Sequence, residues 1–292
     1  MRIHKNPALF RSLTVVACLG TVLFTSASGL AQNLFVSSIS DSVLLSGNII
    51  DVSPDGTIAS FAHALSPATL ALAMSSAGNL FVDSGSSILE FTPGGVQNTF
   101  ASGFIQPVGL AFNSAGDLFA ASGTSILEFT PGGVKSTFAS GLTDPRGLAF
   151  NSVGDLFVGT GRSITEIMPG GTESVYASDL GDINFLAVDS AGDVFAENGE
   201  TLLKITPNGV ESAFATLPVN VGQMTFNNAG DLLVANQNGD DILEFAPNGT
   251  PSVYLSGIVG PRGLAFAVPE PSSWMLLSVG MAGLLMRFRR RC

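Results

Sequence analysis

The feature of the sequence that most limits its fold is a tandem repeat with a period of 38 residues. Five copies begin at Asn79, Asp117, Asp155, Asp193 and Asp231. An earlier copy begins at Asn33 and is eight residues longer than the others. Six units in tandem predict a repeat architecture, in which every unit is one supersecondary structure packed against its neighbours.

Turn residues divide each unit into four short strands. The stretch GLAFNS stops at a Gly-Asp turn, DLFAAS follows, SILEFTP stops at Pro-Gly-Gly, and KSTFAS stops at Gly. No unit contains ten residues with helical periodicity, so solenoids built on helices are excluded. Four strands per unit fit the blade of a β-propeller, with the fourth and most polar strand outermost.

The two ends of the repeat array predict how the ring closes. The first unit starts with the second type of strand at Asn33, whereas the last unit ends with the first type of strand at 260–266. The C-terminal strand can therefore complete the first blade and leave no open edge in the array. We expect an all-β, six-bladed propeller of four-stranded blades.

The segment from Pro145 to Val158, PRGLAFNSVGDLFV, resembles the NHL repeat family of six-bladed propellers. The likeness covers nearly all of residues 33–267. It departs from the family in the short turn between the second and third strands, except in the last unit at 236–241. The resemblance implies the fold but no activity, because propellers carry many unrelated functions.

The N-terminal 31 residues have the pattern of a secretory signal peptide. Basic residues come first, an apolar core extends from about Leu13 to Phe24, and small residues precede a predicted cleavage after Ala31. The run that ends at Cys18 loosely matches a lipoprotein cleavage box, which is the alternative. We expect three parts: 1–31 signal peptide, 32–267 propeller and 268–292 sorting tail.

The C-terminal tail combines a Pro-Glu-Pro motif, an apolar run and a basic cluster. Its residues are Pro269, Glu270, Pro271, then Trp274 to Met286, then Arg287, Arg289, Arg290 and Arg291. This order resembles the PEP-CTERM sorting signal. The resemblance implies export by the secretion machinery and processing by an exosortase-type membrane peptidase.

The apolar run of the tail is short for a membrane span. Thirteen residues extend about 20 Å as a helix, against a hydrocarbon core of about 30 Å. The arginines that follow are expected on the cytoplasmic side, which leaves the propeller outside. We expect transient membrane association, with a permanent single-span anchor as the alternative.

Charge and cysteine content exclude several classes of function. Between the two terminal segments, five basic residues stand against 23 acidic ones, a formal charge of −18. Nucleic acid is excluded as a partner, because its binding depends on cations that meet phosphates. The only cysteines, Cys18 and Cys292, lie in the terminal segments, so a processed chain has no thiol and no disulfide.

Two enzyme families of this fold, the gluconolactonases and the virginiamycin B lyases, predict positions for catalytic groups. In the lactonases, metal ligands lie where the innermost strands enter the channel, which here corresponds to Ala68 or Leu70, Val108, Arg146, Asn184, Gly222 and Arg262. Only Asn184 could ligate a metal. A lyase needs a histidine, and the sole candidate, His63, is expected on an outer strand.

The remaining polar residues predict a binding mouth. Arg146 and Arg262 are three units apart, hence opposed across a six-fold ring, and with Asn184 could bind an anion. Carboxylates that recur in every unit are interpreted as serving the blades. Those that do not recur are Asp83 and Glu197, at one equivalent second-strand position, and Asp189; Asp240 and Asp241 are candidates for Ca²⁺.

The sequence therefore predicts an exported, exosortase-processed propeller of the cell surface or extracellular matrix. We expect a binding module without catalytic activity or cofactor, whose partner is an extracellular polysaccharide or a surface protein. The alternative is a hydrolase or lyase with a different channel site.

Overall fold

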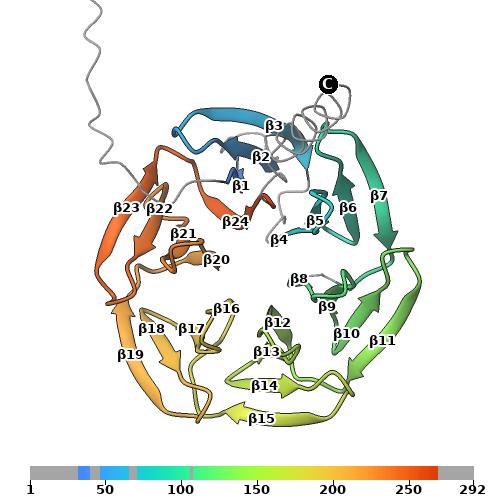
Figure 1. The fold of residues 1–292 in the computed structure, drawn as a ribbon, viewed down its shortest axis with the longest axis vertical. Coiled ribbons are helices and arrows are strands. Elements are labelled where there is room, and N and C mark those ends of the chain that lie inside the picture. Colours follow the sequence, from blue (N-terminus) through green and yellow to red (C-terminus); the bar gives the residue numbers. More distant parts are fainter. Residues whose placement is uncertain (1–31, 40–46, 66–70, 106–107, 269–292) are drawn as a thin grey trace, which may run out of the picture.

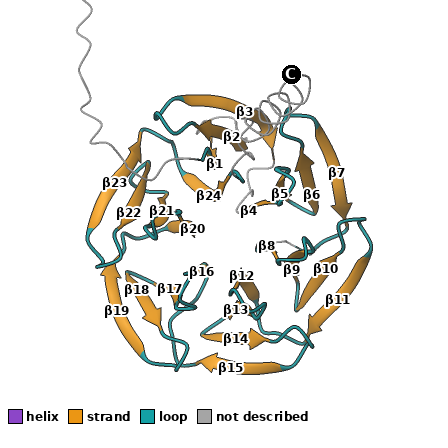
Figure 2. Cartoon of the chain, viewed as in Figure 1, coloured by secondary structure: helices purple, strands orange, loops and turns teal. Residues whose placement is uncertain are grey.

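The structure is a computed structural model that describes residues 32–39, 47–65, 71–105 and 108–268. Twenty-four strands form six four-stranded antiparallel sheets around a central axis (Figure 1). The described ranges contain strands and loops and no helix (Figure 2). The predicted six-bladed, all-β propeller is confirmed. The segments interpreted as a signal peptide and a sorting tail, including Pro269 to Pro271, Trp274 and the terminal arginines, lie outside the described residues.

Each blade is one sheet whose four strands follow one another from the ring axis outward. Blade 1 contains β24 (Pro261–Phe266), β1 (Leu34–Ile39), β2 (Gly47–Val52) and β3 (Ile58–Leu65). Blade 2 contains β4 (Leu72–Met74), β5 (Leu80–Ser84), β6 (Ser87–Phe91) and β7 (Gln97–Ser102). Blade 3 contains β8 (Leu110–Phe112), β9 (Leu118–Ser122), β10 (Ser125–Phe129) and β11 (Lys135–Ser140).

The other three blades have the same order of strands from the axis outward. Blade 4 contains β12 (Pro145–Phe150), β13 (Leu156–Thr160), β14 (Ser163–Ile167) and β15 (Glu173–Ala177). Blade 5 contains β16 (Leu186–Val188), β17 (Val194–Asn198), β18 (Thr201–Ile205) and β19 (Glu211–Thr216). Blade 6 contains β20 (Val221–Phe226), β21 (Leu232–Asn236), β22 (Asp241–Phe245) and β23 (Pro251–Ser256).

The ring closes through β24, as the sequence predicted. This strand pairs antiparallel with β1, and Phe266 lies opposite Leu34. The N–H of Ala267 also donates to the carbonyl oxygen of Asn33 at 2.8 Å. Both ends of the propeller therefore lie on one face, which carries the turns between first and second strands. We call it the exit face, and the opposite face the mouth face.

The hydrophobic core lies between consecutive blades. Each buried cluster combines side chains of two neighbouring sheets; in the one between blades 3 and 4, the ring of Phe119 packs edge-on against Phe138 and Phe150 with centroids 5.0 and 4.9 Å away. Such contacts add to the free energy gained by burial. The outermost strands begin with exposed residues, as in β11, which agrees with their polar sequence.

Repeated polar residues hold the turns of the exit face. In blade 3 the Asn113 Oδ1 accepts hydrogen bonds from the N–H groups of Ala115 and Asp117, and Asn113 Nδ2 donates to the Asp117 carboxylate at 2.9 Å. Asn151 and Asn227 make the same contacts in blades 4 and 6. These recurring carboxylates serve the blades, as the sequence indicated.

Candidate functional site

The channel is closed where the innermost strands come nearest to one another. Each strand places one residue at this level, and these residues are Ala71, Gly109, Gly147, Phe185, Gln223 and Gly263. A Cβ atom added at Gly109 would lie 1.9 Å from the carbonyl oxygen of Arg146 on the next blade, so no side chain fits there.

Gln223 ties three blades together at this level. Its Oε1 accepts hydrogen bonds from the N–H groups of Leu72 and Leu264 at 3.0 and 3.1 Å, and its Nε2 donates to the Leu72 carbonyl oxygen at 3.0 Å. The side chain thereby satisfies the inner edges of two strands. The sequence analysis missed Gln223. It could have been noticed, because a large polar residue stands there at a position where four other units have glycine or alanine.

A cavity lies on the exit side of this closure. It has a volume of about 270 Å³, its floor includes Gln223, and its walls come from Leu72, Leu110, Phe112, Leu264 and Phe266. None of the described residues that line it is charged. The charged groups predicted to form a site lie on the other side of the closure, at the mouth face.

Four side chains from blades 4 and 5 meet at the mouth face, and we call them the mouth cluster: Asp144, Arg146, Asn184 and Glu197. Arg146 Nε and Nη2 each lie 2.9 Å from Asp144 Oδ2, and Arg146 Nη1 donates to Asn184 Oδ1 at 2.6 Å. The side chains of Arg146 and Asp144 are 43% and 59% exposed. A ligand on this face can therefore reach both charges.

Glu197 is the buried member of the mouth cluster. The residue is 8% exposed, and Oε2 has no hydrogen-bond partner among the described residues. Burial raises the pKa of Glu197 to about 7, and this outweighs the hydrogen bonds from Asn184 and Phe185 and the charge of Arg146, which lower it. A carboxyl group that titrates near neutral pH can take up or release a proton there.

Arg262 lies across the ring from Arg146, as the spacing predicted. Its strand β24 and the strand β12 of Arg146 face each other through the centre (Figure 1). Asp83 follows Arg262 by one blade, just as Glu197 follows Arg146 by one blade. Asp83 is 1% exposed, and its Oδ1 accepts the N–H of Ala71 at 2.9 Å. Two combinations of an arginine and a carboxyl group thus occupy positions half a turn apart.

The predicted mouth residues come from three different blades. The structure joins Arg146 to Asn184 and places β24, the strand of Arg262, opposite β12, while anion binding by the three stays a prediction. Asp144 and Glu197 extend the set beyond what the sequence assigned. Glu197 was recognisable as a carboxylate that does not recur, and it contacts Asn184 within blade 5, whereas the contact of Arg146 with Asn184 depends on how blades 4 and 5 pack.

The positions at which a lactonase holds its metal carry other side chains in this protein. Asn184 Oδ1, the one ligating atom predicted there, accepts a hydrogen bond from Arg146. Val108 and Gly222 offer no ligating side chain, and Ala68 and Leu70 lie outside the described residues. Across the part of the chain that the structure describes, no three His, Cys, Asp or Glu side chains are grouped to hold a metal ion.

The other candidate residues, Asp240, Asp241 and His63, lie close to partners within the protein. Asp240 Oδ1 accepts the N–H of Gly260 and Asp241 Oδ1 accepts the Asn236 side-chain amide, both at 2.8 Å, so the protein's own donors use both carboxylates predicted as Ca²⁺ ligands. His63 is exposed on the outermost strand β3, with Nε2 2.7 Å from Ser60 Oγ. This confirms its predicted place away from the channel.

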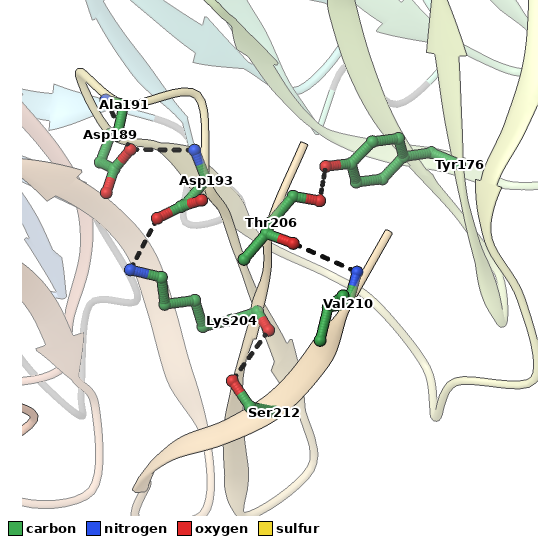
Figure 3. A network of polar contacts seen from close by, with 8 residues as sticks. All are labelled: Tyr176, Asp189, Ala191, Asp193, Lys204, Thr206, Val210 and Ser212. Carbon is green, nitrogen blue, oxygen red and sulfur yellow. Dashed lines mark hydrogen bonds and ion pairs between the residues drawn. The ribbon is translucent and has the colours of Figure 1, made fainter. Parts of the chain in front are cut away.

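A groove of about 300 Å³ separates blades 4 and 5 on the exit face. Tyr176 lines it and donates its hydroxyl to the carbonyl oxygen of Thr206 on the next blade at 2.7 Å. Nearby, Lys204 Nζ lies 2.6 Å from Asp193 Oδ2 (Figure 3). The first contact joins two blades and the second joins two strands of blade 5. The polar groups beside the groove therefore stabilise the fold, and we assign them no ligand.

Comparison with solved structures gives the fold. The chain is similar to a chain of a nidogen/laminin complex (TM-score 0.70, 17% identity, 82% of this chain and 99% of that chain covered). It is also similar to virginiamycin B lyase from Staphylococcus aureus (0.60, 17%, 82% and 94%) and to a gluconolactonase from Xanthomonas campestris (0.58, 17%, 64% and 75%). These likenesses show the propeller fold alone.

Comparison with protein families identifies the C-terminal tail. A PEP-CTERM protein-sorting motif matches residues 267–291, which is the tail that the sequence singled out. The comparison with curated protein sequences returns no match. No helix within the described ranges is long and apolar enough to cross a membrane. The chain is therefore a six-bladed propeller followed by a sorting signal of exported proteins.

Proposed function

We propose that this protein is an exported binding module that the tail delivers to the cell surface, where the mouth face holds a polysaccharide without chemical change. The sorting motif at residues 267–291 supports the route. The observation that carries the binding role is the mouth cluster, where the Arg146 guanidinium joins Asn184 of the next blade at 2.6 Å. The charged and amide groups that meet there do not recur in every unit, so the blades do not need them to fold.

The mixture of groups in the mouth cluster favours a ligand rich in hydroxyl groups. A hydroxyl can donate to the Asp144 carboxylate and accept from Arg146, so neighbouring hydroxyls of a sugar can use both charges. The central part of the chain has a formal charge of −18, which disfavours strongly acidic chains at long range. A neutral or amino polysaccharide fits these conditions better than the anion that the two arginines alone suggest.

Binding to neutral, acidic and amino polysaccharides by calorimetry tests the proposal. Replacing Arg146 and Arg262 together with alanine should weaken binding about tenfold or more, since charged hydrogen bonds are lost. Arg162→Ala is the matched control, because Arg162 is exposed on the same face. Unchanged binding by the double variant would overturn the role of the mouth, and preference for acidic chains would restore the anion prediction.

The sorting step has a separate test. The intact mass of the protein from its native host should correspond to a chain that begins near Gln32 and ends at 269–271, recovered from the surface or the medium. An exosortase-type peptidase is the partner that this processing requires. A chain that still ends at Cys292 would mean that the tail is a permanent anchor.

Glu197 supports a second candidate function, a hydrolase or lyase. Its pKa of about 7 suits a general acid or base, and it is buried at the channel mouth of a fold that certain enzymes share. A screen of lactones, esters and elimination substrates would test this second function. Turnover that Glu197→Gln abolishes, with the fold intact, would favour the enzyme over the binding module.

A further inference from the structure

The two ends of the propeller lie on the face opposite the mouth cluster. Strand β24 runs from Pro261 at the mouth face to Phe266 at the exit face, and it is the innermost strand of its blade. The chain therefore leaves the propeller near the ring axis, on the side away from Arg146 and Glu197. The first described residues, before β1, lie on this same side because Leu34 pairs with Phe266.

The segment that joins the propeller to the apolar tail is short. Residues 267–273 separate Phe266 from Trp274, and seven residues span at most about 25 Å when fully extended. Reaching the mouth face from outside requires crossing three strand spacings, about 14 Å, and then the length of a five-residue strand, about 17 Å. The segment is too short for this path of about 31 Å, to which side chains of the outermost strand add.

The path through the ring is also closed. Among the described residues, the cavity at the narrowest level is about 10 Å³, and the Gln223 side chain of blade 6 bonds Leu264 of blade 1 and Leu72 of blade 2 beside it. An extended polypeptide cannot pass such an opening. The tail consequently reaches its membrane position from the exit face alone.

We propose that, while the tail holds the protein in the membrane, the exit face points toward the lipid surface and the mouth face points away from it. This rests on the sorting step of the proposed function. The orientation gives an extracellular polysaccharide access to Arg146 and Glu197 before the tail is processed. It also places the Pro269 to Pro271 motif within three to five residues of the last strand, so the peptidase must work beside the exit face.

Energy transfer to a lipid surface tests the orientation. The chain from Gln32 with Cys292→Ser has no other thiol, so a donor dye can be attached at Ser114→Cys on the exit face or at Thr124→Cys on the mouth face. Both positions are exposed and belong to blade 3. In vesicles with acceptor-labelled headgroups, transfer from position 114 should clearly exceed transfer from position 124.

The control is a longer tether. Inserting about 14 glycine and serine residues after Val268 adds about 45 Å or more of reach and should bring the two transfer efficiencies together. Equal transfer without the insertion, or greater transfer from position 124, overturns the proposed orientation. Transfer from neither position means that the tail does not hold the chain at the bilayer, which overturns the sorting step as well. Polysaccharide binding, measured in solution, is independent of all these outcomes.

Discussion

Lys204 Nζ lies 2.6 Å from Asp193 Oδ2, and this ion pair replaces the contact that an asparagine makes in other blades. In blades 3, 4 and 6 an asparagine amide donates to the equivalent aspartate. In blade 5 that asparagine is Asp189, which cannot donate, and Lys204 stands where four other units have glutamate and the first has Asp51. Two departures from the repeat thus compensate each other within one blade (Figure 3).

Lys204→Glu should lower the free energy of unfolding by about 1–2 kcal/mol, because it places a third carboxylate beside Asp189 and the mostly buried Asp193. The double variant Asp189→Asn with Lys204→Glu restores the pattern of the other blades and should recover most of the loss. Chemical denaturation of Lys204→Glu, Asp189→Asn and the double variant, together with the native chain, forms a double-mutant cycle. Additive effects of the two changes would contradict the compensation, and Lys135→Glu, at the exposed start of β11, is the control.

The two tyrosines that replace phenylalanine should respond in opposite ways to Tyr→Phe. Tyr176 donates to Thr206, so its replacement should cost about 1 kcal/mol. The Tyr254 hydroxyl is buried without a hydrogen-bond partner among the described residues, so its replacement should be neutral or stabilising. Thermal unfolding of the two variants compares them directly, and equal losses would count against both assignments.

The pH dependence of stability should contain a contribution from Glu197. Its pKa rises from 4.5 to about 7 on folding because burial disfavours the charged form. The folded chain therefore keeps a proton that the unfolded chain loses, so the stabilising contribution is complete below pH 4.5 and is lost as the pH rises to about 7. Glu197→Gln should remove about 1–3 kcal/mol of this decline.

Urea unfolding between about pH 4 and pH 8 measures the decline for the native chain and the variant. The matched control is Glu200→Gln, since Glu200 is exposed in the same blade. An identical pH profile for the native chain and Glu197→Gln would show that Glu197 titrates near its ordinary value.

Gly109 should tolerate no side chain. Alanine there would place Cβ 1.9 Å from the Arg146 carbonyl oxygen and push two innermost strands apart, at a cost of about 3 kcal/mol or more. Gly132 of the same blade has its nearest neighbour, Thr130 Oγ1, at 3.8 Å, so Gly132→Ala should change stability by less than about 0.5 kcal/mol. Circular dichroism on denaturation compares both, and a stable Gly109→Ala variant would mean that the ring can expand.

Much of the fold followed from the sequence because each blade is a local structure. The 38-residue period, the turn residues and the alternation of strands specify a blade through contacts close in sequence. The mismatch between the first and last units then specified the β1–β24 pairing. The positions of Arg146 and Arg262 on opposite sides of the ring followed from the number of blades, because the two residues are three units apart.

The mouth cluster depended on tertiary structure, because its side chains come from two blades and meet only when these pack. Spacing places Arg146 and Asn184 at equivalent positions, but only the packed ring shows that Arg146 bonds Asn184 and that Glu197 is buried beside them. The closure of the channel by Gln223 is similarly non-local, since it joins residues 151 positions apart. Sequence periodicity determined the blades, whereas distances and burial between blades decided which polar groups can act together.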